Sequence, residues 1–321
     1  MGLLCFACSL FFGYFFIKIS KKINAGQPIL KYVEEHKKKN GTPTMGGLFF
    51  IIPTAVIYLI FVGVKERVGV VALCICLAFM LVGFLDDFIK IKFKKNEGLK
   101  PYQKIIFQFG IALTAGLFCF FNGITTFNLP FVKLSIDLGE WTIFLVGIIF
   151  IAITNSVNLT DGIDGLAGSV SIVYLSFIAV IVYMQSDLVK QFYDYSYEND
   201  TLIKLSVCFI GAILGFLVYN YNKAKVFMGD TGSLAIGGLL GAISIFSGNS
   251  LLIPILGVTF VFSSVSVIMQ VFFYKKTKKR IFLMAPFHHH LQMKGLSEGK
   301  ISFFYSLLTV IIGVVLVISY L

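Results

Sequence analysis

The chain has 321 residues, of which 57% are hydrophobic and only 13% are charged, and its formal net charge is +11. A water-soluble domain carries about 25% charged residues, so this composition excludes an ordinary soluble protein and predicts a chain whose solvent is the lipid bilayer. The positive charge alone could suggest nucleic-acid binding, but its distribution along the chain favours a membrane protein that binds no nucleic acid.

Apolar stretches long enough to cross a bilayer follow one another along the whole chain. A membrane-spanning helix needs about 20 mostly apolar residues, and ten such stretches occur in chain order. We therefore predict an all-α integral membrane protein with about ten transmembrane helices in a single domain, residues 1–321. The eighth stretch is short and rich in glycine, a residue that weakens helices. The predicted spans are residues 3–19, 46–64, 68–85, 103–121, 141–157, 166–184, 202–219, 233–247, 251–273 and 302–320.

Lysine and arginine are spread unevenly over the connections between the predicted spans. Ten spans place both chain ends on one side of the membrane, and most of the 27 basic residues fall in connections on the opposite side. Cytoplasmic loops carry an excess of Lys and Arg, so we expect the basic side, and the active site with it, to be cytoplasmic and both termini to be extracytoplasmic. This charge would also attract membrane lipid headgroups and anionic substrates. The basic residues left for the outer side are Lys65, Arg67, Lys133, Lys190 and Lys204.

Two adjacent aspartates, Asp86 and Asp87, stand at the predicted cytoplasmic end of the third span, in the segment FLDDFIKIK. Adjacent acids at the C-terminus of a helix repel each other and oppose the helix dipole, so they need a positive partner. Carboxylates near a bilayer are costly and tend to be functional, which favours Mg²⁺ or phosphate chemistry. The alternative is a solvated helix end that pairs with Lys90.

The connection between the fifth and sixth spans is long and polar, with the sequence NSVNLTDGIDGLAG at 155–168. Asn155 and Asn158 are three residues apart, as are Asp161 and Asp164, so each pair could share a helix face. Small polar side chains threaded between glycines suit recognition of a sugar, a base or a metal ion. The alternative is an Asx-rich turn that caps the sixth span.

A third motif, residues 220–238, leads into the eighth span. Asp230 and Thr231 directly precede the apolar run, so they could cap its helix. A helix N-terminus with glycines nearby also binds phosphate readily, and the two interpretations are compatible. Phe227 could stack on a nucleobase, although contact with lipid or with the protein core is the simpler interpretation.

Three consecutive histidines, His288 to His290, lie between the ninth and tenth spans. Neighbouring helical residues are about 100° apart, so all three cannot ligate one metal ion from a regular helix, and zinc sites prefer other spacings. Contact with phosphate or with a sugar acid is the functional interpretation, and a solvated patch beside the membrane is the alternative. A fifth segment, KKKNGTPTMGG at 37–47, combines cations, hydroxyls and glycines. It suits anion binding, although a basic flank that sets topology would look similar.

These five segments, in this order, resemble the polyprenyl-phosphate N-acetylhexosamine-1-phosphate transferase superfamily, and within it the branch that transfers phospho-N-acetylmuramoyl-pentapeptide. The resemblance rests on GTPTMGG, DDxxK, NxTDGxDGLAG, FMGDTGSLAxGG and APxHHH, and it runs from about Lys37 to Lys300. It implies a bacterial plasma-membrane enzyme that uses Mg²⁺ to convert UDP-MurNAc-pentapeptide and undecaprenyl phosphate into lipid I and UMP. The family often continues the histidines with Phe-Glu and a later Trp, where this chain has Leu291, Gln292 and Leu296.

Phosphoryl transfer needs neutralised charge on the pyrophosphate and an oriented nucleophile. The resemblance therefore implies that Asp230 is the principal Mg²⁺ ligand, while Asp86 and Asp87 position or deprotonate the lipid phosphate and assist the metal. Lys90 and Lys104 would neutralise phosphate oxygens. We expect direct attack rather than an aspartyl-phosphate intermediate, because the lipid phosphate is already an oxygen nucleophile at neutral pH. The expected substrate-binding residues are Lys39, Thr44, Asn158, Asp161, Asp164, Asn220, Phe227, His288, His289 and His290.

Two rival functions stay open at this point. A sister enzyme would transfer GlcNAc-1-phosphate, although GTPTMGG and the unbroken histidine pattern favour the muramoyl branch. A secondary transporter would bury charge near the bilayer midplane, often within inverted repeats, whereas the acids here cluster at one face and no repeat is evident. A homodimer is compatible with the sequence.

Overall fold

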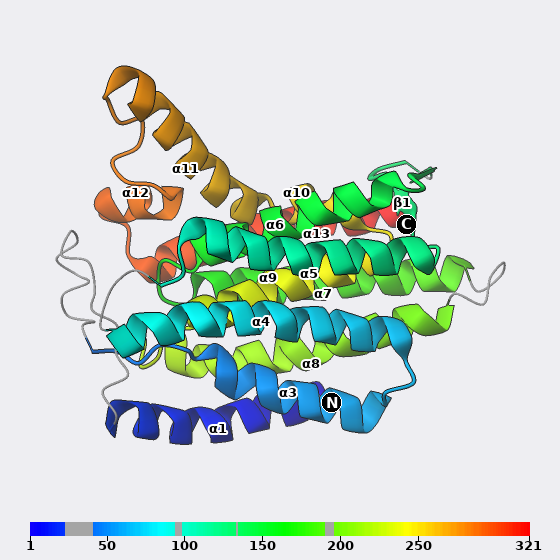
Figure 1. The fold of residues 1–321 in the computed structure, drawn as a ribbon, viewed down its shortest axis with the longest axis horizontal. Coiled ribbons are helices and arrows are strands. Elements are labelled where there is room, and N and C mark those ends of the chain that lie inside the picture. The colour runs from blue at the N-terminus through cyan, green and yellow to red at the C-terminus, as the bar shows by residue number, and fades with distance from the viewer. Residues whose placement is uncertain (23–40, 94–97, 133, 190–195) are drawn as a thin grey trace.

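The protein is an elongated bundle of roughly parallel and antiparallel helices in a computed structural model, which describes residues 1–22, 41–93, 98–132, 134–189 and 196–321 (Figure 1). Each long helix coincides with one of the apolar runs of the sequence, because a continuous apolar stretch in lipid must satisfy its backbone polar groups internally. The long helices are α1 (Gly2–Lys22), α3 (Gly47–Val62), α4 (Arg67–Phe93), α5 (Pro101–Phe121), α6 (Trp141–Thr160), α7 (Leu166–Val189), α8 (Ser196–Asn220), α9 (Gly229–Phe246), α11 (Val258–Thr277) and α13 (Glu298–Tyr320).

Nine helices of the described chain are long and apolar enough to cross a membrane. The tenth, α3, is apolar but has 16 residues. The prediction of an all-α membrane protein is thereby confirmed, apart from one small antiparallel pair, β1 (Thr126–Asn128) with β2 (Ser135–Asp137), which the sequence did not suggest. The side on which each terminus lies stays a prediction.

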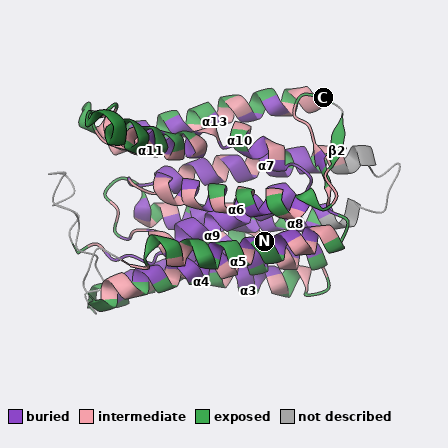
Figure 2. Ribbon diagram, turned by 45° about the horizontal axis from the view of Figure 1, so that its top comes forward, coloured by how far each residue is buried: buried purple, intermediate pink, exposed green. Residues whose placement is uncertain are grey.

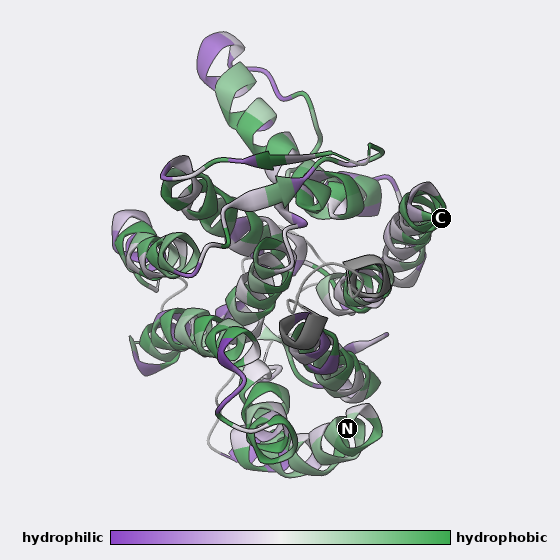
Figure 3. Cartoon of the chain, turned by 90° about the vertical axis from the view of Figure 1, so that its right-hand side faces the viewer, coloured by the Kyte–Doolittle hydropathy of each residue, from purple (hydrophilic) through white to green (hydrophobic). Residues whose placement is uncertain are grey.

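Large apolar side chains remain exposed on the outer helices, as expected where lipid is the solvent. Examples are Phe11 on α1, Phe144 on α6 and Phe303 on α13. Figure 3, which looks along the bundle, shows hydrophobic residues around its outside as well as within it.

The glycine-rich eighth run forms α9, the most enclosed helix of the bundle, and every residue from Thr231 to Phe246 is buried (Figure 2). Its small residues allow neighbouring helices to approach closely. A Cβ on Gly237 would crowd the backbone of α6 at Thr154, and a Cβ on Gly47 of α3 would crowd Gly232. The glycines that weakened the helix prediction are therefore what places α9 at the centre.

The ninth predicted run, 251–273, is not one continuous helix. It is divided into a 3-10 turn, η1 (Ser250–Leu252), a short helix, α10 (Ile253–Leu256), and α11, which begins after Gly257. From this break α11 diverges from the bundle and leads to a short helix, α12 (Phe287–Met293), which returns the chain to α13 (Figure 1). Hydropathy alone does not reveal the break, but Pro254, which lies in the first turn of α10, is a sequence signal for a kink in this run.

Candidate functional site

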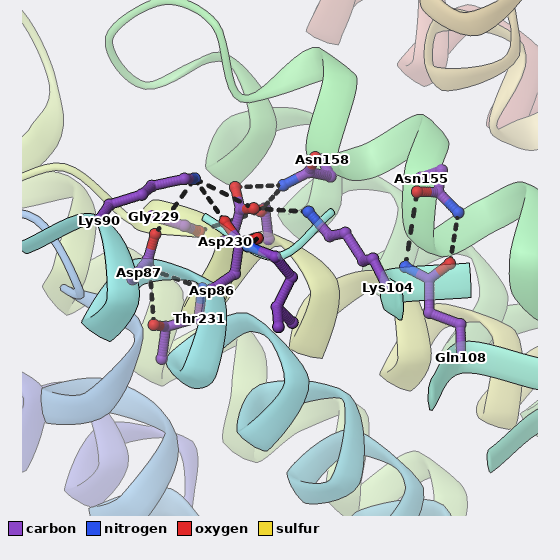
Figure 4. A network of polar contacts seen from close by, with 12 residues as sticks. Asp86, Asp87, Lys90, Lys104, Gln108, Asn155, Asn158, Gly229, Asp230 and Thr231 are labelled. Atoms are coloured by element: carbon purple, nitrogen blue, oxygen red, sulfur yellow. Dashed lines mark hydrogen bonds and ion pairs between the residues drawn. The ribbon is translucent and has the colours of Figure 1, made fainter. Parts of the chain in front are cut away.

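Three carboxylates from two helices meet at one end of the bundle. Asp86 and Asp87 come from the C-terminal part of α4, and Asp230 comes from the first turn of α9. One oxygen of each lies within 4.8 Å of one oxygen of the others (Figure 4). The close packing of α4 on α9 brings them together, because a Cβ on Gly83 would overlap the carbonyl oxygen of Asp230.

Each carboxylate is held by a donor from another part of the chain. Asp86 Oδ1 accepts a hydrogen bond from the backbone N–H of Leu99 at 2.8 Å. Asp87 Oδ2 accepts from both the backbone N–H and the hydroxyl of Thr231, at 2.9 and 2.7 Å. Asp230 Oδ1 accepts from the Asn158 amide at 2.8 Å. The three groups are therefore fixed before any ligand binds.

Two lysines face these carboxylates. Lys90 Nζ lies 2.6 Å from Asp86 Oδ2, 3.3 Å from Asp230 Oδ2 and 3.8 Å from Asp87 Oδ1. Lys104 Nζ, from α5, lies 2.6 Å from Asp230 Oδ2. Asp87 is fully buried and Asp86 is 3% exposed, which rules out the alternative of a solvated helix end.

Three carboxylates facing two ammonium groups leave this cluster with one net negative charge. Carboxylate oxygens are the ligands that Mg²⁺ and other hard cations prefer, and the oxygens of Asp86, Asp87 and Asp230 are close enough together to share one ion. The residues present therefore fit a divalent metal ion.

The GTPTMGG segment pairs with the chain that leads into α9. Backbone hydrogen bonds join Phe227 N to the Pro43 carbonyl at 2.8 Å and Gly46 N to the Phe227 carbonyl at 2.9 Å. Thr44 is buried here, and a Cβ on Gly229 would meet both the Thr44 hydroxyl and the Asp87 carboxylate. Gly229 also has a φ of +74°, which favours glycine.

The segment predicted as a polar connection begins within α6, which extends to Thr160, and its residues differ in how they contribute to the acidic site. Asn158 reaches it directly and also donates to Ser233 at 2.8 Å. Asp161 is partly buried at the end of α6. Burial, followed by repulsion from Asp230 and Asp87, raises the pKa of Asp161 well above its usual range.

Asp164 and Asn220 are buried and brace the loops beside the acidic site. Asp164 accepts a hydrogen bond from the backbone N–H of Ala224 at 2.8 Å. Asn220 accepts from Gly165 N and donates to the Val226 carbonyl, both at 2.9 Å. Phe227 is half-buried in the same connection. Lys39 lies outside the described residues.

Two of the three histidines of α12, His288 and His289, lie against Gly162 with their ring centroids 4.3 Å apart, whereas the ring of His290 lies against Phe287. His288 is fully buried against Gly162, where a Cβ would overlap its Nε2. Neither of its ring nitrogens has a hydrogen-bond partner among the described residues, and burial lowers its pKa well below the usual range. A solvated patch therefore does not describe His288.

The other two histidines have polar partners. His289 Nδ1 lies 3.0 Å from Gln292 Oε1. His290 Nδ1 accepts from the backbone N–H of Leu283 at 3.1 Å, and its ring stacks on Phe287.

Several residues of this region were not singled out as site residues from the sequence. Gln108 of α5 pairs with Asn155, whose amide donates to Gln108 Oε1 at 2.8 Å. A polar Gln within an apolar run was an available signal for this pair. Glu298, at the start of α13, accepts from the backbone N–H of Asp164 at 2.8 Å and from Gln292 at 3.1 Å. The position of Glu298 in the first turn of a helix did not indicate this role, because acidic residues are common there for electrostatic reasons alone.

Comparison with known proteins gives a consistent result. A family model described as glycosyl transferase family 4 matches residues 69–248. A model for phospho-N-acetylmuramoyl-pentapeptide-transferase signature 1 matches residues 39–51.

Similar proteins that carry the name phospho-N-acetylmuramoyl-pentapeptide-transferase match nearly the whole chain. The one from Clostridium botulinum strain Alaska E43 is 41% identical over 315 residues, which cover 98% of this chain and 93% of the relative. That from Caldanaerobacter subterraneus is 39% identical over 310 residues, covering 96% and 94%. The one from Clostridioides difficile is 37% identical over 321 residues, covering 99% and 96%.

Proposed function

The chain belongs to glycosyl transferase family 4 and, within it, to the phospho-N-acetylmuramoyl-pentapeptide-transferases, and from this membership we propose its reaction. It transfers phospho-N-acetylmuramoyl-pentapeptide from UDP-MurNAc-pentapeptide to undecaprenyl phosphate, and it releases UMP. The product, lipid I, is an intermediate of peptidoglycan synthesis. The protein is a multi-pass protein of the bacterial inner membrane.

The observation that carries this proposal is the buried cluster of three aspartates and two lysines at one end of an apolar bundle. The reaction joins a water-soluble nucleotide-sugar to a lipid phosphate, so its site must be reached from both phases. Charged groups at the helix ends meet this requirement, and we place that end of the bundle on the cytoplasmic side because of the lysine-rich connections.

We assign the metal to the carboxylates and the phosphates to the lysines. Asp230 is the principal Mg²⁺ ligand, with Asp86 and Asp87 beside it. When bound, Mg²⁺ would supply the positive charge that stabilises the leaving pyrophosphate oxygen. Lys104 and Lys90 neutralise phosphate oxygens, which removes the repulsion between two anionic substrates.

The hydrogen bonds of the aspartates favour direct attack by the lipid phosphate over a covalent aspartyl-phosphate. A nucleophilic carboxylate needs an oxygen that can approach phosphorus. Asp87 is fully buried and its Oδ2 already accepts two hydrogen bonds from Thr231. Asp86 accepts from Leu99 with one oxygen and contacts Lys90 with the other. Both carboxylates are better suited to hold and orient a ligand than to attack phosphorus.

Release of UMP from the purified protein tests this proposal. We expect release only when UDP-MurNAc-pentapeptide, undecaprenyl phosphate and Mg²⁺ are all present, and we expect loss of release on addition of a chelator. A parallel assay with UDP-GlcNAc distinguishes the sister enzyme. UMP release with UDP-GlcNAc but not with UDP-MurNAc-pentapeptide would overturn the muramoyl assignment.

A further inference from the structure

A chain of hydrogen bonds runs from α12 through the start of α13 to the polar loop after α6. His289 Nδ1 lies 3.0 Å from Gln292 Oε1. Gln292 Nε2 donates to Glu298 Oε1 at 3.1 Å. The backbone N–H of Asp164 donates to Glu298 Oε2 at 2.8 Å. The imidazole is thus connected through two side chains to a backbone group.

The direction of each hydrogen bond follows from the Asp164 end. A backbone N–H can only donate, and an ionised carboxylate can only accept. Gln292 must therefore turn its NH₂ group toward Glu298 and its carbonyl oxygen toward His289. A carbonyl oxygen only accepts, so His289 Nδ1 must carry a proton. Neutral His289 is then the Nδ1–H tautomer, in which Nε2 is the acceptor nitrogen.

The acceptor nitrogen lies close to the loop that adjoins the acidic cluster. A Cβ on Gly162 would lie 2.9 Å from His289 Nε2. Four residues earlier in the chain, in the last turn of α6, Asn158 donates to Asp230. A ligand that reached the aspartates from this side would pass the imidazole, and any N–H or O–H group on it could donate to Nε2.

We propose that Gln292 and Glu298 are positioning residues, which fix His289 in the Nδ1–H tautomer so that Nε2 accepts a hydrogen bond from an N–H or O–H group of the nucleotide-sugar. The identity of that ligand rests on the proposed function, whereas the tautomer does not. The tautomer of His289 and its contact with the nucleotide-sugar can therefore be refuted separately.

Nitrogen-15 NMR of protein labelled at histidine tests the tautomer directly. The chain has four histidines, so single substitutions assign the signals. Long-range ¹⁵N–¹H correlations then show which ring nitrogen of His289 carries the proton at a pH where the ring is neutral. We expect Nδ1–H in the unaltered protein, and finding Nε2–H there would overturn the proposal.

Glu298→Gln should reverse the tautomer without removing a side chain. The oxygen of the new amide would face the N–H of Asp164, so its NH₂ group would face Gln292. Gln292 would turn to present its carbonyl oxygen, and its NH₂ group would then face His289 Nδ1. Nδ1 would have to accept, so the proton would move to Nε2. Retention of Nδ1–H in this variant, with the His288 and His290 signals unchanged, would also overturn the proposal.

Kinetic measurements distinguish a positioning role of Gln292 and Glu298 from a purely structural one. Glu298→Gln and Gln292→Leu should each raise the KM for the nucleotide-sugar about 10-fold to 100-fold, the loss expected for one hydrogen bond. The KM for undecaprenyl phosphate should stay unchanged. Met293→Ala, an exposed change on the same helix, is the matched control and should alter neither KM nor tautomer. Equal KM values for all three variants would refute the substrate contact, and absence of UMP release from the unaltered protein would refute only the proposed function.

Discussion

Lys90 is shared by the three aspartates of the site, with its ammonium group 2.6 Å from Asp86, 3.3 Å from Asp230 and 3.8 Å from Asp87. One flexible cation thereby offsets charges that would otherwise repel one another in a buried site. A divalent cation brought to the same oxygens would compete with it. We therefore expect Lys90 to exchange aspartate contacts for phosphate contacts when substrates bind.

Replacing Asp230 by Asn should nearly abolish turnover. The variant keeps an oxygen for Asn158 but loses the negative charge that opposes Lys90 and Lys104. We expect UMP release to fall about 100-fold or more, the size of effect seen when one charge-stabilising group is lost from an active site. Near-normal Mg²⁺-dependent release from a variant that purifies and melts normally would contradict the assignment.

His288 should make the protein less stable in mild acid. Burial lowers its folded-state pKa well below the value of about 6.5 that it has when unfolded. Below that value the unfolded chain binds a proton that the folded chain does not, so stability falls by up to about 1.4 kcal/mol per pH unit. The contribution is fully present above pH 6.5.

A comparison of melting temperatures at pH 7.5 and 5.5 checks this. His288→Phe should show a smaller decrease between the two pH values than the unaltered protein. His290→Phe, which changes a ring that is only partly enclosed, serves as the control. An identical decrease in His288→Phe would show that folded His288 binds a proton as readily as unfolded His288, which would contradict the prediction.

At the residue scale, motif and spacing predicted the charged groups but not their supports. Asp86 and Asp87 were predicted as site residues because adjacent acids at a helix end are unfavourable without a positive partner. Lys90 and Lys104 supply that positive charge. The roles of Gln292 and Glu298 could not be predicted, since both depend on how α12 folds back against the loop at Asp164.

The contact between α4 and α9 determines how the site is assembled. Gly83→Ala should disturb it, because the added Cβ would overlap the carbonyl oxygen of Asp230. Overpacking of this kind costs about 1 to 3 kcal/mol, and here it would also displace a site residue. We expect a lower melting temperature together with at least tenfold slower UMP release.

Gly110→Ala on α5 is the matched control for this helix contact. A Cβ there would meet no atom within 4 Å, and Ala favours a helix by up to about 1 kcal/mol over Gly. The control should be as stable and as active as the unaltered protein. If Gly83→Ala behaved in the same way, the close approach of the two helices would not be needed for the site.

Hydropathy located the helices but did not reveal how they end or break. The run at 251–273 is continuously apolar, yet the chain forms η1 and α10 before α11 begins. The strands β1 and β2 have three residues each, which is too short for an alternating pattern to be recognised. Such features depend on packing against other elements, and a local apolar count contains no information about that.

The orientation of the whole molecule can be tested at its C-terminus. The lysine-rich connections predict that both termini are extracytoplasmic and that the acidic cluster faces the cytoplasm. A short epitope after Leu321 should therefore react with a membrane-impermeant label in cells whose outer layers have been removed. A cysteine placed at exposed Lys279 should react only after lysis, and the opposite pattern would reverse the proposed topology.

The enclosure of α9 has a consequence for how the protein meets bilayers of different thickness. Outer helices such as α1, α11 and α13 contact lipid and must tilt or shift when hydrocarbon thickness changes. From Thr231 to Phe246, α9 is surrounded by protein. This helix therefore has no lipid-facing surface whose length must match the thickness of the bilayer. Asp230 is carried by a helix that the bilayer does not adjust directly, and the spacing of the charged groups should be insulated from changes in acyl-chain length.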